Sequence, residues 1–174
     1  TCALPISVPA SNTQCNLTAT GSPAAGDFFD FALIAGANNS NLQKKLYMAS
    51  SAAGFNNGRS KITVAPGAGF SAQGVAGNPT VIGMLSGATY YTFVSSGAFS
   101  VAYSSWSNMD ESGIQLSGTG PISLSSSTFD FAGEGLVSTN TYLTLRSLTS
   151  NATFYNLTFD NSRSSGTNRY NIDA

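Results

Sequence analysis

One pattern of about 22 residues recurs three times between residues 99 and 159, and it limits the folds open to this chain. In each pass, apolar residues alternate with serine or threonine, and a short polar stretch separates two such runs. Residues in equivalent positions lie 21 to 23 apart: Val101, Leu124 and Leu145; Ile114, Leu136 and Leu157; Trp106 and Phe129; Gly113 and Gly135. A repeat of this length suits a solenoid in which each pass forms one coil and equivalent residues stack.

The expected fold class is therefore all-β, with a short parallel β-helix or solenoid-like core and one N-terminal helix. The helix is expected within residues 38–50, where Leu42, Leu46 and Ala49 form an apolar stripe at helical spacing. Such a helix would cover an open end of the coils, where exposed strand edges invite aggregation. The alternative is an antiparallel β-sandwich, whose turns recur about every 8 to 12 residues.

The 174 residues are expected to form a single domain, because no Pro/Gly/Ser-rich hinge divides them. Within it we expect an extended arm over residues 1–22, a capping region over 23–88 and the β-coil repeats over 89–174. A disulfide between Cys2 and Cys15 would clip the arm and stabilise it by about 3 kcal/mol. Two free thiols are the alternative, and they would need a reducing compartment.

The composition favours an extracellular or cell-surface protein. Only 9% of the residues are charged, and the net charge is -1. The seven lysines and arginines are scattered, which argues against nucleic-acid binding, and no apolar run is long enough to span a membrane. Abundant serine, threonine, asparagine and glycine are typical of the coils and turns of secreted β-proteins. A nearly neutral surface also tolerates packing against copies of itself.

The carboxylates Glu111 and Glu134 are the candidate metal ligands. They lie 23 residues apart, so they would stack on adjacent coils at a strand spacing of about 4.8 Å. Like charges that close repel unless a proton or a cation lies between them, and Ca²⁺ prefers carboxylate oxygens. The alternative is that both are solvated side chains in the coil turns. A histidine-dependent nucleophilic mechanism is excluded because the chain has no histidine.

Three tyrosines are the candidate contacts for a carbohydrate or a protein partner. Tyr91, Tyr103 and Tyr155 each adjoin an apolar residue that is expected to face inward, so their own side chains should face outward. In contrast, the alignment of Trp106 with Phe129 predicts an aromatic stack in the interior.

Four Asn-x-Ser/Thr sequences are possible glycosylation sites if the source and the compartment permit the modification. They begin at Asn16, Asn38, Asn151 and Asn156.

Two segments resemble rungs of the right-handed parallel β-helices of bacterial surface proteins, phage tailspikes and pectin-degrading enzymes. They are residues 105–114 (SWSNMDESGI) and residues 154–161 (FYNLTFDN). The resemblance covers about residues 90–161. It implies fold more than activity. Calcium is also the ion that a resemblance to the pectin-cleaving members implies.

Together these patterns predict a non-enzymatic extracellular structural or adhesive module, a self-assembling subunit of a surface fibre or filament. Its partners would be copies of itself, and the arm could add a strand to a neighbour's sheet. The alternative is a carbohydrate-binding or carbohydrate-cleaving β-helix domain, with a surface polysaccharide as partner.

Overall fold

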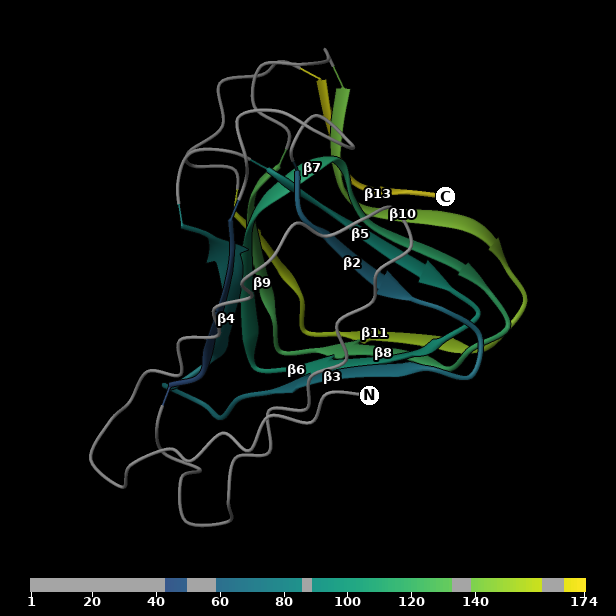
Figure 1. The fold of residues 1–174 in the computed structure, drawn as a ribbon, viewed down its shortest axis with the longest axis horizontal. Coiled ribbons are helices and arrows are strands. Elements are labelled where there is room, and N and C mark those ends of the chain that lie inside the picture. The colour runs from purple at the N-terminus through teal and green to yellow at the C-terminus, as the bar shows by residue number, and fades with distance from the viewer. Residues whose placement is uncertain (1–42, 50–58, 86–88, 133–138, 161–167) are drawn as a thin grey trace, which may run out of the picture.

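The computed structural model describes residues 43–49, 59–85, 89–132, 139–160 and 168–174, and its regular elements are all β-strands (Figure 1). No helix occurs in these ranges, and hence none that could cross a membrane. The strands are β1 (Lys45–Met48), β2 (Lys61–Val64), β3 (Gly69–Gln73), β4 (Thr80–Met84), β5 (Tyr90–Ser95), β6 (Ala98–Ala102), β7 (Ser104–Gly118), β8 (Ile122–Ser125), β9 (Thr128–Ala132), β10 (Thr139–Leu148), β11 (Ala152–Tyr155), β12 (Thr158–Asp160) and β13 (Asn168–Asp173).

Every pairing between these strands is parallel. One sheet has four strands, in the order β3-β6-β8-β11, and the other has nine. The nine-stranded sheet has two flanks. We call β1, β4, β9 and β12 with the first half of β7 the β4–β9 flank, and β2, β5, β10 and β13 with the second half of β7 the β5–β10 flank. The chain visits the β5–β10 flank, the four-stranded sheet and the β4–β9 flank in turn (Figure 1).

The long strand β7 joins the two flanks by a bend. Its residues 105–109 pair with β9, whereas residues 114–118 pair with β10. Gly113, at the bend, has a φ of 60°, and a Cβ placed there would lie 2.2 Å from the carbonyl oxygen of Tyr142. Only glycine fits this close approach of the two strands.

The core consists of side chains that stack from one strand to the next. On the β4–β9 flank, the register places Ile82, Trp106, Phe129 and Phe159 in one column. The Phe129 and Phe159 rings stack with centroids 5.5 Å apart. Trp106 is fully buried, and its indole Nε1 donates a hydrogen bond to the Ser104 hydroxyl at 2.9 Å. The predicted interior pairing of Trp106 with Phe129 is confirmed.

The alignment of the first two passes of the repeat is confirmed for Val101 with Leu124 and for Trp106 with Phe129, but Ile114 pairs with Leu143 rather than Leu136. The alignment of the second pass with the third is wrong. Val101 pairs with Leu124, as the 23-residue spacing predicts. Leu124, however, pairs next with Phe154, and Leu145 pairs with Leu116. The predicted alignment of Leu145 with Leu124 is therefore incorrect.

An insertion after Phe129 explains why the predicted alignment fails from this point on. Ile114 follows Trp106 by eight residues, whereas its partner Leu143 follows Phe129 by 14. The same alignment therefore fails for Leu157, which the spacing had matched to Ile114. Gly135 and Leu136 lie outside the described residues.

The predicted N-terminal helix is wrong over the part of its range that the structure describes. Residues 45–48 form strand β1, in which Leu46 and Met48 are half-buried while Lys45 and Tyr47 are exposed. This period of two arises because β1 pairs in parallel with β4, and tertiary pairing overrides a weak helical stripe. Residues 38–42 and 50 lie outside the described part. The parallel pairings also contradict the antiparallel sandwich.

The Phe129→Ala variant should be less stable than the parent protein by about 3–5 kcal/mol, because it leaves a cavity between Trp106 and Phe159. Denaturant unfolding can be followed by the fluorescence of Trp106, the single tryptophan. Phe129→Leu, which keeps most of the volume, should lose about 1 kcal/mol. The exposed Tyr155→Ala serves as the control and should change stability little. Equal stabilities for Phe129→Ala and this control would contradict the stacked core.

Candidate functional site

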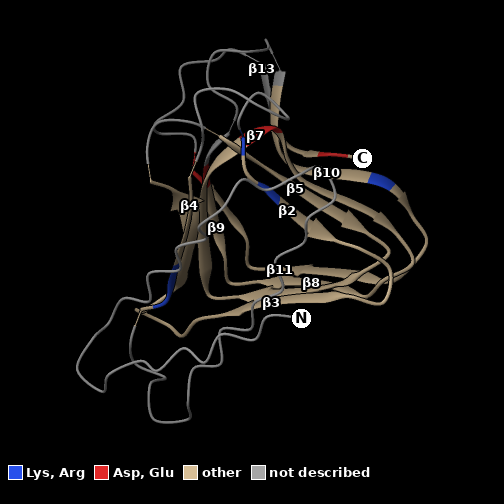
Figure 2. Ribbon diagram, viewed as in Figure 1, with Lys and Arg blue, Asp and Glu red and all other residues tan. Residues whose placement is uncertain are grey.

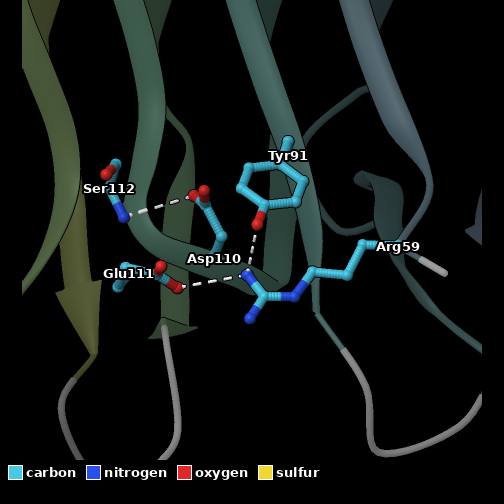
Figure 3. Close-up of polar contacts among 5 residues, drawn as sticks. All are labelled: Arg59, Tyr91, Asp110, Glu111 and Ser112. Atoms are coloured by element: carbon cyan, nitrogen blue, oxygen red, sulfur yellow. Dashed lines mark hydrogen bonds and ion pairs between the residues drawn. The ribbon is translucent and has the colours of Figure 1, made fainter. Parts of the chain in front are cut away.

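The bend of β7 gathers the strongest cluster of ionisable side chains in the described part of the chain (Figure 3). Asp110 and Glu111 lie on the bend, Tyr91 lies on β5, and Arg59 precedes β2. Both Met109 and Asp110 are buried, so the in–out alternation of the strand breaks here. The bend thereby turns a carboxyl group into the interior.

Arg59 links three neighbouring strands of the β5–β10 flank. Its Nη1 donates to the Tyr91 hydroxyl at 2.8 Å and to Glu111 Oε2 at 3.3 Å (Figure 3). Its guanidinium carbon lies 5.0 Å from the centroid of the Tyr91 ring, within the range of a cation–π interaction. The side chains of Arg59 and Glu111 are only 11% and 26% exposed, so solvent screens this ion pair less than a surface pair.

Asp110 is 1% exposed, and its pKa is raised from 3.8 to about 7. Burial is the largest cause, because it disfavours the charged form, and the neighbouring Glu111 carboxylate is the next. The backbone N–H of Ser112, which donates to Asp110 Oδ1 at 3.2 Å, opposes the rise in pKa, as do Arg59 and the Gly113 N–H.

Tyr90 lies beside this group and is fully buried. Its hydroxyl has no hydrogen-bond partner among the described residues. Burial, and secondly the charge of Asp110, raise the pKa of Tyr90 well above 10. The cluster can therefore bind and release a proton at Asp110 near neutral pH. Because Asp110 and Tyr90 are buried, a change in the protonation of Asp110 should alter the stability of the fold.

The predicted metal pair is not tested by these contacts. Glu134 lies outside the described residues, and Glu111 pairs with Arg59. Over the described ranges, no group of three or more His, Cys, Asp or Glu side chains is placed to hold a metal ion. The calcium site stays a prediction.

Sequence reasoning missed Arg59 and Asp110. Arg59 is 52 residues from Glu111 and precedes the repeats, so no spacing connects the two. The adjacent acids Asp110 and Glu111 just before Gly113 were the available signal, because a glycine-dependent bend can bury one of two neighbouring side chains.

The three candidate tyrosines have different environments. Tyr91 is half-buried beneath Arg59, and its ring stacks on Phe93 at 5.8 Å. Tyr103 is 42% exposed and Tyr155 is 69% exposed, and both lie where the four-stranded sheet turns toward the β4–β9 flank. A role of these residues in binding stays a prediction.

Two of the four possible glycosylation sites lie in the described part of the chain. Asn151 and Asn156 are exposed, and the Asn156 Nδ2 donates to the Ser126 hydroxyl at 3.4 Å. Outside the described residues lie Cys2, Cys15, Asn16 and Asn38.

No protein-family model matches this chain, and comparisons with curated proteins and with solved structures found no similar protein.

The pKa of Asp110 predicts a pH-dependent stability. The folded chain holds a proton at Asp110 up to about pH 7, whereas the unfolded chain releases it near 3.8. The contribution of Asp110 to the free energy of unfolding should therefore be full below pH 3.8 and should fall by about 4 kcal/mol as the pH rises to about 7. Asp110→Asn should remove this fall, measured by denaturant unfolding between pH 4 and 8.

Asp173→Asn is the matched control, because Asp173 forms an exposed ion pair with Arg146. This variant should keep the pH dependence of the parent protein. If Asp110→Asn also keeps it, the assignment of the titration to Asp110 is wrong.

Proposed function

We propose that this chain is a non-enzymatic extracellular structural or adhesive module, a short parallel β-helix that assembles with copies of itself into a fibre or filament. The proposal rests on the incomplete burial of apolar side chains at the two ends of the stack of strands. The fully buried apolar side chains lie mostly in the middle coils, whereas the partly buried ones lie mostly on the first and last strands. The partly buried set at the ends includes Leu46, Met48, Ile62 and Phe70, and Ala152, Phe154, Leu157 and Phe159.

The order of the strands along the chain supports a parallel β-helix. Three successive strands pass through the β5–β10 flank, the four-stranded sheet and the β4–β9 flank, and the next three repeat this order. Columns such as the one that contains Ile82, Trp106, Phe129 and Phe159 therefore continue through successive coils. A solenoid of this kind has two open ends that must be covered or stacked.

The columns at the two ends match in chemistry. Leu46 on β1 and Phe159 on β12 occupy the same column of the β4–β9 flank. Ile62 on β2 and Ile172 on β13 occupy the same column of the β5–β10 flank. Head-to-tail stacking would place Phe159 on Leu46 of the next copy and Ile172 on Ile62. A head-to-tail contact of this kind is open-ended, so it generates a filament.

In such a junction β13 of one copy and β1 of the next would lie in the same coil, on the β5–β10 flank and the β4–β9 flank. The third strand position of that coil would lie in the four-stranded sheet, between β11 of one copy and β3 of the next. The arm over residues 1–22 is the segment that we assign to it, with Leu4, Ile6 and Val8 facing inward. In an extended arm, Pro5 and Pro9 would face the same edge, and neither has a backbone N–H to donate. The arm would therefore form a complete set of backbone hydrogen bonds along its other edge only.

The first test is the size of the purified chain, measured by light scattering and negative-stain microscopy over a range of concentrations. Filaments or large ordered assemblies are expected. A chain that remains a monomer at every concentration would contradict the proposed assembly.

An edge variant should block assembly without unfolding the subunit. The N–H of Tyr91 donates to the Ser60 carbonyl at 3.0 Å, and alternate residues of a parallel strand bond to the same neighbour. Ser60 and Ile62 therefore face β5, and the N–H of Thr63 faces the side of β2 on which the described residues place no strand. Thr63→Pro should abolish assembly while leaving the unfolding temperature nearly unchanged.

Thr63→Ala is the control, because it removes the same exposed side chain and keeps the N–H. It should assemble like the parent chain. If Thr63→Pro folds and still forms filaments, the β2 edge is not part of the junction.

Deletion of residues 1–15 tests the arm separately. The shortened chain should remain soluble and should not form filaments, measured by sedimentation. Normal filaments from the shortened chain would rule out the arm and leave the stacked ends as the remaining contact.

A further inference from the structure

The outward face of the four-stranded sheet carries a continuous row of hydroxyl groups. In the register of β3, β6, β8 and β11, one hydroxyl side chain from each strand stands next to that of the neighbouring strand. This hydroxyl row consists of Ser71, Ser100, Ser123 and Thr153, and all four are exposed. Because neighbouring strands lie about 4.8 Å apart, the hydroxyls repeat at that interval across the sheet.

One end of the hydroxyl row is fixed by hydrogen bonds. The Gln73 Nε2 donates to the hydroxyl of Ser100 at 3.2 Å and to that of Ser71 at 3.4 Å. It also donates to the Ser100 carbonyl at 3.1 Å. These two hydroxyls each accept one hydrogen bond and keep their own O–H as a donor to a ligand.

The four strands of this face contain no charged residue. Figure 2 shows them without blue or red, whereas β1, β2, β7, β10 and β13 of the other sheet carry charged side chains. The four strands themselves give an acidic or basic polymer no electrostatic advantage, and the Nζ of Lys44, which donates to the Gln73 carbonyl at 3.4 Å, reaches the end of β3. The face is complementary to an uncharged ligand that both donates and accepts hydrogen bonds.

Aromatic side chains border the hydroxyl row. Tyr155 is the residue after Phe154 on β11, and it points to the same side of the strand as Thr153. Its side chain is the most exposed of the described tyrosines, at 69%. Tyr103 follows β6 at the same rim of the sheet, and its N–H donates to the Ser125 carbonyl at 3.2 Å. Exposed tyrosine rings offer flat apolar surfaces to the C–H faces of sugars.

We propose that the hydroxyl row and Tyr155 form a binding site for an uncharged polysaccharide chain that runs across the four strands. The hydroxyls exchange hydrogen bonds with sugar hydroxyls at successive strands, and the tyrosine ring packs against a sugar ring at the edge. The site does not depend on self-assembly, because all its residues lie on one subunit.

Retention on insoluble cellulose and chitin, and affinity electrophoresis in soluble dextran and starch, test this site, with polygalacturonate as the acidic polymer. At least one neutral polymer should bind, with equal strength at low and high salt. Ser123→Lys and Tyr155→Ala should each weaken that binding at least tenfold. Ser95→Lys, at an exposed position on β5, is the matched control and should bind like the parent chain.

Three results would overturn the site. The first is retention by none of the neutral polymers, and the second is binding of polygalacturonate alone. The third is full binding by both Ser123→Lys and Tyr155→Ala in folded form. Repeating the measurement in the Thr63→Pro background separates the site from assembly: retained binding by this variant supports a site on the single subunit. Loss of binding there would assign the effect to assembled copies instead.

Discussion

The stacking of equivalent side chains on parallel strands is the constraint on which the rest of the structure depends. Trp106 lies between Ile82 and Phe129 in its column, and each strand is thereby held in register by the strands on either side. A shift of one residue would turn every inward side chain of a strand to the outside. The columns therefore fix the position of the β7 bend and of the hydroxyl row.

The corners preserve that register because they repeat one backbone conformation. After β6, β8 and β11, the residues Tyr103, Ser126 and Asn156 have φ values of 47°, 44° and 51°. This left-handed conformation costs about 1–2 kcal/mol for residues other than glycine. Its recurrence after three neighbouring strands of the four-stranded sheet indicates that the pairing of the flanking strands offsets the cost.

Much of the fold could be predicted from the 23-residue spacing that relates Trp106 to Phe129, because both fill one interior column. The pairing partners of Leu145 and Phe154 could not be predicted, because extra residues before Leu143 shift the strand pairing. The alternation of apolar and polar residues does not reveal such an insertion. The strand at residues 45–48 was also hidden, because its partner β4 lies 36 residues further along the chain. The Arg59–Glu111 contact could not be predicted from the sequence, because Arg59 precedes the repeats and no spacing relates it to Glu111.

We propose that parallel strands stack along one axis within a subunit and from one subunit to the next. X-ray diffraction from aligned assemblies tests it most directly, because parallel strands perpendicular to that axis repeat every 4.7–4.8 Å or so along it. A reflection near 4.8 Å on the meridian of the pattern is expected. The same reflection on the equator, or its absence from well-aligned assemblies, would contradict it.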